Sequence, residues 1–232
     1  YYTEALELFK SMDLHVRGFS PVELLRLAEK EEMEVSELLE ILKAAGLGSV
    51  PGAGAEILTE NMRDQLSPKK LSAEDWCFVM GECHKAGLQG SCNIAFGSTE
   101  TDEDVIMHLN YIREQQDKTG GFLSFVPWVF QQQTKDFTVN YVKGTQYLKM
   151  IALSRLFFDN IDHIEVSVLG MGKELGELAL SAGADDINSI VIEENVLASK
   201  GLKTLRAAQK FIEKAGFKPK RRTLCYEYDK YL

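Results

Sequence analysis

The sequence predicts an α/β protein with a parallel sheet, specifically a (β/α)8 barrel of the TIM type. Short β-rich runs alternate with helical patterns along the 232 residues, which is the order of right-handed βαβ units. Polar residues and glycines follow almost every β run, as in a barrel that gathers its site from all strand ends. No linker or change in composition divides the chain, so residues 1–232 are predicted to form a single domain.

Six β runs are predicted, and each precedes a helical pattern. The runs are Leu14 to Phe19, Gly48 to Val50, Gly90 to Phe96, Phe122 to Val126, Ile164 to Leu169 and Ile187 to Ile192. The helices are predicted from Pro21, from Ser36, through Met62, over 74–85, after Thr101, and over 145–158, 173–181 and 202–214. Ser20, Ser72 and Thr101 are typical N-caps. An open doubly wound sheet is the alternative, but it would concentrate function at one switch point.

Charge and composition exclude several classes of protein. The 35 acidic residues outnumber the 26 basic ones, so we expect no nucleic-acid partner. The basic run Lys218 to Arg222 is predicted to be a solvated loop. No apolar run approaches the roughly 20 residues of a membrane span, so we expect no membrane insertion and a cytoplasmic location. The four cysteines form no Cys-x2-Cys pair and are predicted to be free thiols without a metal site.

Four segments at predicted strand ends carry candidate functional residues. Gly52, Gly54 and Glu56 form a glycine-rich strand-to-helix turn that can approach an anion or a ribose, or can simply be a tight turn. The other segments contain Gly97 with Glu100, Trp128 with Gln131, and Glu193 with Glu194. Helix capping, core packing and a solvated loop are their respective alternatives. His84 and His108 fall inside helices and are predicted to be surface or packing residues.

Several blocks of sequence resemble one enzyme family. They are Pro51 to Leu58, Ser67 to Lys70, Phe96 to Thr101, Gln116 to Phe122, Val126 to Gln131, Ala152 to Asn160 and Ile192 to Val196. Together they are similar to radical S-adenosylmethionine enzymes of the futalosine route to menaquinone, over nearly the whole chain. The resemblance implies that the six predicted units are the third to the eighth of the barrel. Trp128 and Asn195 are most similar to the branch that cyclises dehypoxanthine futalosine.

The resemblance also implies cofactors, partners and residue roles. The whole enzyme would use S-adenosylmethionine at a [4Fe–4S] cluster to make a radical. That radical would take a hydrogen from the ribose of a nucleoside substrate, which then adds to its own benzoate ring. An electron donor for the cluster is a further implied partner. The implied cofactor-binding residues are Gly52, Gly54, Glu56, Arg63, Gly97 and Glu100; the substrate-binding residues are Trp128 and Gln131; the catalytic residues are Glu193 and Glu194.

The sequence departs from the family in one large respect. The family holds its cluster through Cys-x3-Cys-x2-Cys, and this chain has no such spacing and begins without Met. We therefore expect an N-terminally incomplete sequence that is inactive alone. Arg17, Ala53 and Ser98 stand where the family commonly has His or Lys, Gly, and His.

Three alternatives stay open. Aminofutalosine synthase and the deazaflavin synthase subunits of coenzyme F420 formation are the nearest related enzymes. A nucleoside-binding or scaffold protein that never carried a cluster is the alternative of another class.

Overall fold

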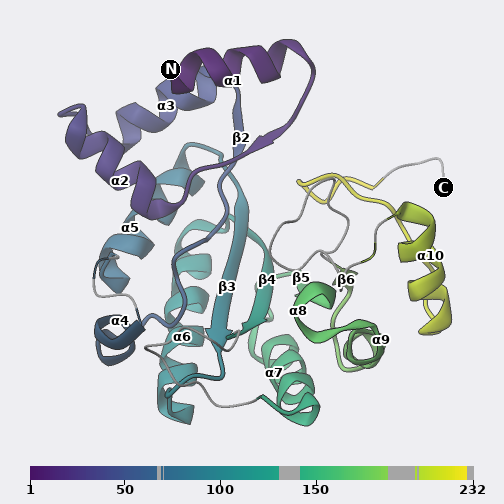
Figure 1. The fold of residues 1–232 in the computed structure, drawn as a ribbon. Coiled ribbons are helices and arrows are strands. Elements are labelled where there is room, and N and C mark those ends of the chain that lie inside the picture. The colour runs from purple at the N-terminus through teal and green to yellow at the C-terminus, as the bar shows by residue number, and fades with distance from the viewer. Residues whose placement is uncertain (67–68, 70, 131–141, 188–201, 203, 229–232) are drawn as a thin grey trace, which may run out of the picture.

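The structure is a wall of parallel strands with helices along its outer side (Figure 1). This computed structural model describes residues 1–66, 69, 71–130, 142–187, 202 and 204–228. The strands in these ranges are β1 (Val16–Arg17), β2 (Leu47–Ser49), β3 (Gly90–Phe96), β4 (Phe122–Val129), β5 (His163–Val166) and β6 (Asp186–Ile187). The pairs β1–β2, β3–β4, β4–β5 and β5–β6 are all parallel. Within each of these two sheets the chain order of the strands is therefore their order in space, as in a barrel wall.

Residues 50–56 join the two sheets into one wall. The backbone N–H of Val50 donates to the carbonyl of Gln89 at 3.3 Å, and that of Ala95 donates to the carbonyl of Glu56 at 3.0 Å. The segment after β2 therefore runs beside β3 along most of its length. The predicted (β/α)8-type barrel, with about six of its units in this chain, is confirmed; the single-domain assignment stays a prediction.

The helices begin largely where the sequence predicts them. They are α1 (Tyr2–Ser11), α2 (Pro21–Lys30), α3 (Val35–Ala45), α4 (Glu60–Leu66), α5 (Ala73–Lys85), α6 (Asp102–Thr119), α7 (Gly144–Phe157), α8 (Val168–Met171), α9 (Lys173–Ser181) and α10 (Leu205–Lys214). The side chains of Ser20, Ser72 and Thr101 accept hydrogen bonds from the N–H groups of the first turns of α2, α5 and α6, as predicted. Among the described residues, no helix combines the length and apolar character that a membrane crossing requires.

Several predicted boundaries are wrong, among them the end of the fourth β run, which extends to Val129, and local capping explains two of them. The fifth β run ends at Val166, because the side chain of Ser167 accepts a hydrogen bond from the N–H of Gly170 and starts α8. The last helix begins at Leu205 because Thr204 caps it. The second helix starts at Val35, one residue early. Of the sixth β run, only Ile187 lies within the described residues.

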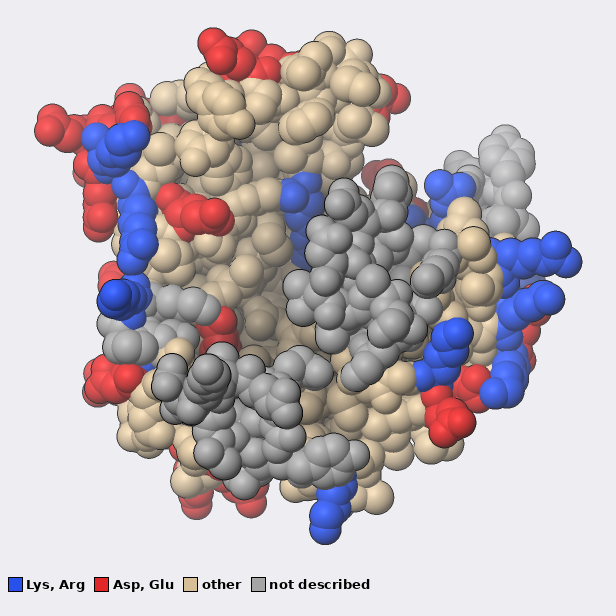
Figure 2. Space-filling view, in the orientation of Figure 1, with Lys and Arg blue, Asp and Glu red and all other residues tan. Residues whose placement is uncertain are grey.

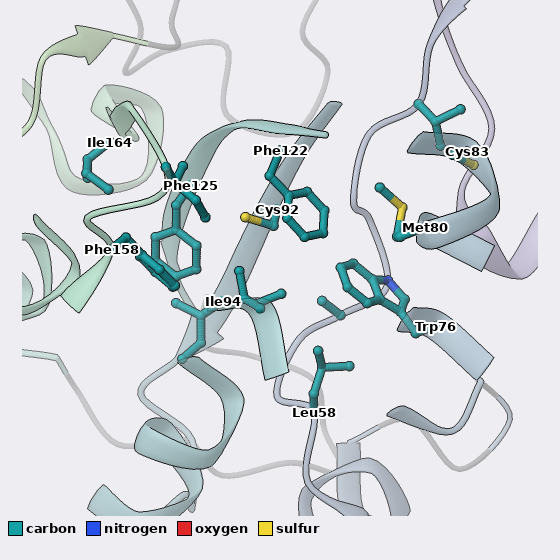
Figure 3. Close-up of a cluster of buried hydrophobic side chains, with 14 of the residues drawn as sticks. Leu58, Trp76, Met80, Cys83, Cys92, Ile94, Phe122, Phe125, Phe158 and Ile164 are labelled. Carbon is teal, nitrogen blue, oxygen red and sulfur yellow. The ribbon is translucent and has the colours of Figure 1, made fainter. Parts of the chain in front are cut away.

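The core fills the space between the outer face of the wall and α5, α6 and α7 (Figure 3). Trp76 of α5 stacks on Phe122 of β4 with a centroid separation of 6.0 Å, and Phe125 contacts Phe158 at 4.7 Å. His84 packs edge-on against Phe122 at 4.6 Å. His84 and His108 are both buried, so their packing assignment is confirmed and the surface alternative is wrong.

Alternation along the strands gives the wall two chemically different faces. Cys92, Phe125 and Ile164 lie in the core on the outer face (Figure 3). Their neighbours Ser91, Ser124 and Glu165 therefore point to the inner face, because successive side chains alternate. Ser91 lies opposite Ser124 in the β3–β4 register, and Glu165 lies opposite Asp186 in the β5–β6 register. A row of polar side chains thus crosses the inside of the barrel wall.

The crossing of residues 50–56 over β3 requires glycine at position 90. A Cβ atom built at Gly90 would lie 1.8 Å from the carbonyl oxygen of Val50, and both atoms belong to backbone of the wall. We expect Gly90→Ala to lower the free energy of unfolding by about 3 kcal/mol, since backbone on both sides must move. Gly18→Ala is the matched control, because its nearest neighbour is a side-chain carbon at 3.8 Å. Urea denaturation of both variants tests this, and equal midpoints would contradict it.

Candidate functional site

The predicted glycine-rich turn is held from several sides by hydrogen bonds to its backbone. Arg63 of α4 donates from Nη1 to the carbonyls of Ala55 at 2.9 Å and Gly54 at 3.3 Å, and from Nε to the carbonyl of Leu71. Trp76 of α5 donates from Nε1 to the carbonyl of Ala53 at 3.2 Å. Buried carbonyls without donors are costly, so these bonds fix the path of the turn.

Helix α6 fixes the end of the same segment. The backbone N–H of Leu58 donates to Nδ1 of His108 at 3.1 Å, and the Thr59 hydroxyl donates to Oδ1 of Asp104 at 2.8 Å. Nδ1 can accept this bond only from the neutral imidazole. Burial lowers the pKa of His108 to about 3, which keeps the ring neutral near pH 7. The turn therefore depends on one buried, uncharged histidine.

The individual turn residues have different surroundings. A Cβ atom at Gly52 would lie 2.3 Å from the carbonyl oxygen of Ser91, so the neighbouring strand requires this glycine. Gly54 has a φ of 83°, which glycine adopts without strain. Glu56 is half-buried with a φ of 38°. Arg63 is 6% exposed, and burial lowers the pKa of its guanidinium while Glu56 opposes that shift. Their roles toward a cofactor stay predictions.

The second predicted segment forms a tight turn where β3 ends. The Glu100 carboxylate accepts hydrogen bonds from the backbone N–H of Gly97, and from the N–H and hydroxyl of Ser98 at 2.7 Å each. Gly97 has a φ of 97°. Glu100 therefore orders the turn, which leads into the capping box of Thr101 and Asp104 at the start of α6.

A cavity of about 630 Å³ opens beside this turn, between the N-terminal parts of α6 and α7. That volume falls in the range typical of small-molecule sites. It is lined by Phe96, Gly97, Ser98, Glu100, Thr101, Asp102, Val105, Ile106, Val142, Gln146, Lys149, Met150 and Leu153. Its wall thus combines apolar side chains with carboxylates and one lysine.

Trp128 lies on the other side of β3 from the glycine-rich segment. It is half-buried near the end of β4 and lies opposite Ala95 in the register with β3. Because Ser124 points inward, alternation directs Trp128 inward as well. The N–H of Ala95 donates to the carbonyl of Glu56, so Ala95 has Glu56 on one side and Trp128 on the other. The structure thus brings Glu56, Gly97 and Trp128 together near the carboxyl end of β3. Gln131, Glu193 and Glu194 lie outside the described residues.

A buried ionic cluster inside the wall was missed by sequence reasoning. Glu165 is 2% exposed and accepts hydrogen bonds from the hydroxyls of Ser124 and Tyr226, the latter at 3.2 Å. Asp186 accepts bonds from Tyr226 at 2.6 Å and from Nε of Arg222 at 2.6 Å. Burial, and then the charge of Asp186, raises the pKa of Glu165.

One residue of this cluster, Glu165, could have been predicted from the sequence. Glu165 is a carboxylate between Ile164 and Val166 in a predicted strand, a position that turns it away from the apolar side. Arg222 was predicted to belong to a solvated loop. That assignment is wrong, because its guanidinium pairs with Asp186 and Glu165 inside the wall. Lys218, Lys220 and Arg221 are exposed as predicted.

The cysteines do not fit an iron–sulfur cluster. Cys83 and Cys92 are buried, and Cys77 and Cys225 are half-buried. Burial raises the pKa of Cys77 to about 11 and that of Cys83 to about 12, which disfavours the thiolate that binds iron. Within the described ranges, which include all four cysteines, no group of three or more His, Cys, Asp or Glu side chains could hold a metal ion. The described residues therefore offer no site for the cluster.

Two buried histidines make the stability of this region depend on pH. Burial lowers the pKa of His84 to about 4 and that of His108 to about 3, below the ordinary 6.5. The unfolded chain binds protons first as the pH falls below 6.5, so folding stability is full above that value and declines toward pH 4. Each histidine can contribute up to about 1.4 kcal/mol per pH unit.

Urea denaturation between pH 7.5 and pH 4.5 measures this dependence. His108→Asn should reduce the slope, whereas His15→Asn, at an exposed position, should retain it. An unchanged slope in His108→Asn would contradict the assignment of a neutral ring.

Comparisons with known proteins agree with the fold and the motifs. Residues 119–232 match the family described as the CofH/MqnC C-terminal region. A cyclic dehypoxanthine futalosine synthase of Streptomyces coelicolor is 39% identical over 95% of this chain and 56% of its own length. One of Halalkalibacterium halodurans is 38% identical over 98% of this chain and 63% of its own length. The chain thus spans less than two thirds of either relative.

Two further comparisons widen the range of relatives. A 5-amino-6-(D-ribitylamino)uracil–L-tyrosine 4-hydroxyphenyl transferase of Methanococcus maripaludis is 35% identical over 97% of this chain and 65% of its own length. The crystal structure of methylornithine synthase (PylB) superposes with a TM-score of 0.70 and 17% identity, covering 95% of this chain and 63% of that one. This last likeness concerns the fold alone. Residues 119–232 therefore belong to the family described as the CofH/MqnC C-terminal region, and the whole chain is similar in sequence to the cyclic dehypoxanthine futalosine synthases.

Proposed function

We propose that this chain forms the cofactor- and substrate-binding wall of an enzyme that cyclises dehypoxanthine futalosine in menaquinone biosynthesis. The observation that carries the proposal is the similarity to two cyclic dehypoxanthine futalosine synthases, which extends over 95% and 98% of the chain. The meeting of Glu56, Gly97 and Trp128 near the end of β3 supports it, since a barrel enzyme needs its groups at the carboxyl ends of the strands.

The residues near the end of β3 suit S-adenosylmethionine, which supplies radical chemistry when bound. Gly52, Gly54 and Glu56 would contact its methionine and ribose parts, and Gly97 and Glu100 its adenosine. The cavity of about 630 Å³ that adjoins the turn at Gly97 has a size typical of small-molecule sites and would accept a nucleoside. Arg63 would act by holding the turn in place, because its guanidinium already binds the carbonyls of Gly54 and Ala55.

The inner face of β4 would hold the substrate. Trp128 would stack on the benzoate ring and exclude water from it. Gln131, Glu193 and Glu194 complete the proposal as a hydrogen-bonding amide and as carboxylates that bind sugar hydroxyls or take the proton lost on rearomatisation. The cysteines of this chain do not fit a [4Fe–4S] cluster. A cytoplasmic location and an external electron donor belong to the same proposal.

A second candidate has its own support. The tyrosine 4-hydroxyphenyl transferase of Methanococcus maripaludis is nearly as similar, at 35% identity over 97% of the chain. Trp128 favours the cyclase by resemblance. Aminofutalosine synthase and a nucleoside-binding scaffold are the remaining alternatives, and both are distinguished by which compound the protein binds and converts.

A substrate comparison tests the proposed function. The protein at the length its cells make, with its cluster reconstituted, is offered dehypoxanthine futalosine in one reaction and 5-amino-6-(D-ribitylamino)uracil with tyrosine in another. Mass spectrometry should find a cyclised product only in the first. Product in the second reaction alone would support the transferase, and binding of the nucleoside without conversion would support the scaffold.

A carboxylate variant tests the cofactor site. Glu56→Gln removes the charge expected to bind the ribose or ammonium of S-adenosylmethionine, so affinity for the labelled cofactor in equilibrium dialysis should fall at least about tenfold. Glu60→Gln is the matched control, since Glu60 is exposed on α4. Equal affinity in the two variants would overturn the role of Glu56.

A further inference from the structure

Arg17 is a cation inside the barrel wall that forms no ion pair with the described residues, although its charge lowers the pKa of Glu165. It ends the short strand β1, is half-buried, and donates from Nη2 to the hydroxyl of Ser91 on β3. Its Nε atom is buried and has no hydrogen-bond partner among the described residues. Within the same ranges, no Asp or Glu oxygen lies within 4.0 Å of its guanidinium. A guanidinium carries several N–H donors in a planar fork, and here one bond to a neutral oxygen is its only contact of this kind.

Other buried or half-buried arginines of the chain are satisfied. Arg63 binds backbone carbonyls of the glycine-rich turn. Arg155 donates to the carbonyls of Gly183 and Asp162 and pairs with Asp185 at 2.8 Å. Arg222 pairs with Asp186. Arg17 differs from them because the described residues supply neither an ion pair nor a set of carbonyls for it.

Arg17 lies at the inner face of the wall, where a substrate would bind. Its partner Ser91 belongs to the polar inner row with Ser124 and Glu165. Glu165 acts on Arg17 only through its charge and forms no ion pair with it, because its carboxylate accepts bonds from Ser124 and Tyr226 and lies 3.9 Å from Arg222. Figure 2 shows a hollow in the middle of this face of the molecule, with Lys or Arg atoms at its upper edge.

We propose that Arg17 binds the carboxylate of the substrate's benzoate group through its free N–H donors. A carboxylate matches the planar fork of a guanidinium and would satisfy Nε and the remaining charge together. This assignment rests on the proposed function, which supplies a substrate that carries such a group.

Depth in the barrel assigns Arg17 to the substrate and not to the cofactor. Ser91 precedes Gly97 by six residues along β3, a rise of about 20 Å in a parallel strand. The predicted adenosine contacts at Gly97 and Glu100 are at the carboxyl end, so Arg17 lies well below them. Trp128, in the register between those levels, would lie along the aromatic ring, with the carboxylate directed down to Arg17.

Binding measurements on the protein at its native length test the assignment without relying on turnover. The probes are dehypoxanthine futalosine, its methyl ester and S-adenosylmethionine, each titrated by calorimetry. The unaltered protein should bind the acid at least about 30-fold more tightly than the ester. Arg17→Met should lose that preference by weakening the acid alone, and Arg17→Lys should retain part of it. Arg206→Met, at an exposed position on α10, is the matched control and should behave as the unaltered protein.

Each other outcome overturns the assignment in a distinguishable way. Equal binding of acid and ester by the unaltered protein, or a preference that survives Arg17→Met, rejects Arg17 but leaves the proposed function intact. A loss confined to S-adenosylmethionine would assign the cation to the cofactor. Failure of the unaltered protein to bind the nucleoside at all would reject both proposals. If Arg17→Met does not fold, the acid-to-ester ratio of the unaltered protein and of Arg17→Lys decides.

Discussion

The path of residues 50–59 is the constraint on which the candidate site depends. This segment joins two short sheets into one wall through the bonds of Val50 to Gln89 and of Ala95 to Glu56. Its carbonyls are bound by Arg63 and Trp76, and its far end is bound by His108 and Asp104. The donors and acceptors come from α4, α5, α6 and β3. A change in any one of these elements is therefore transmitted to the backbone of the turn, and through it to Glu56.

The outer face of the wall stabilises the fold, and the inner face carries polar groups that could bind a ligand. The outer face carries Phe122, Phe125 and Cys92 into an apolar core, where Trp76 and Phe158 cover them (Figure 3). Burial of such aromatic side chains is the main favourable term in folding. The inner face carries hydroxyls and charges instead, which gain nothing from burial unless they are paired. A polar inner face is thus a cost to folding that a ligand-binding role explains.

Much of this organisation could be predicted from the sequence, because it rests on local signals. Ser20 with Glu23 and Thr101 with Asp104 start helices through bonds between residues three apart, and the run Gly90 to Phe96 is a strand throughout. The contacts across the barrel carry no such signal. Arg222 meets Asp186 from 36 residues away, and Arg17 meets Ser91 from 74 residues away. The sequence alone does not indicate that Arg222 and Arg17 face the barrel interior, because their partners are distant along the chain.

Residues 222–226 of the C-terminal segment pack against β5 and β6. Tyr226 stacks on His163 at 3.8 Å and donates to both Glu165 and Asp186, while Arg222 lies 4.0 Å over the Tyr226 ring. Glu165 and Asp186 are tolerated side by side because Arg222 and the hydroxyls of Ser124 and Tyr226 compensate their charges. The carboxylates of the inner face near β5 and β6 therefore already have hydrogen-bond and ion-pair partners. Arg17, on the same inner face, forms no ion pair with either carboxylate among the described residues, and its unpartnered Nε leaves a donor there that suits an anionic ligand.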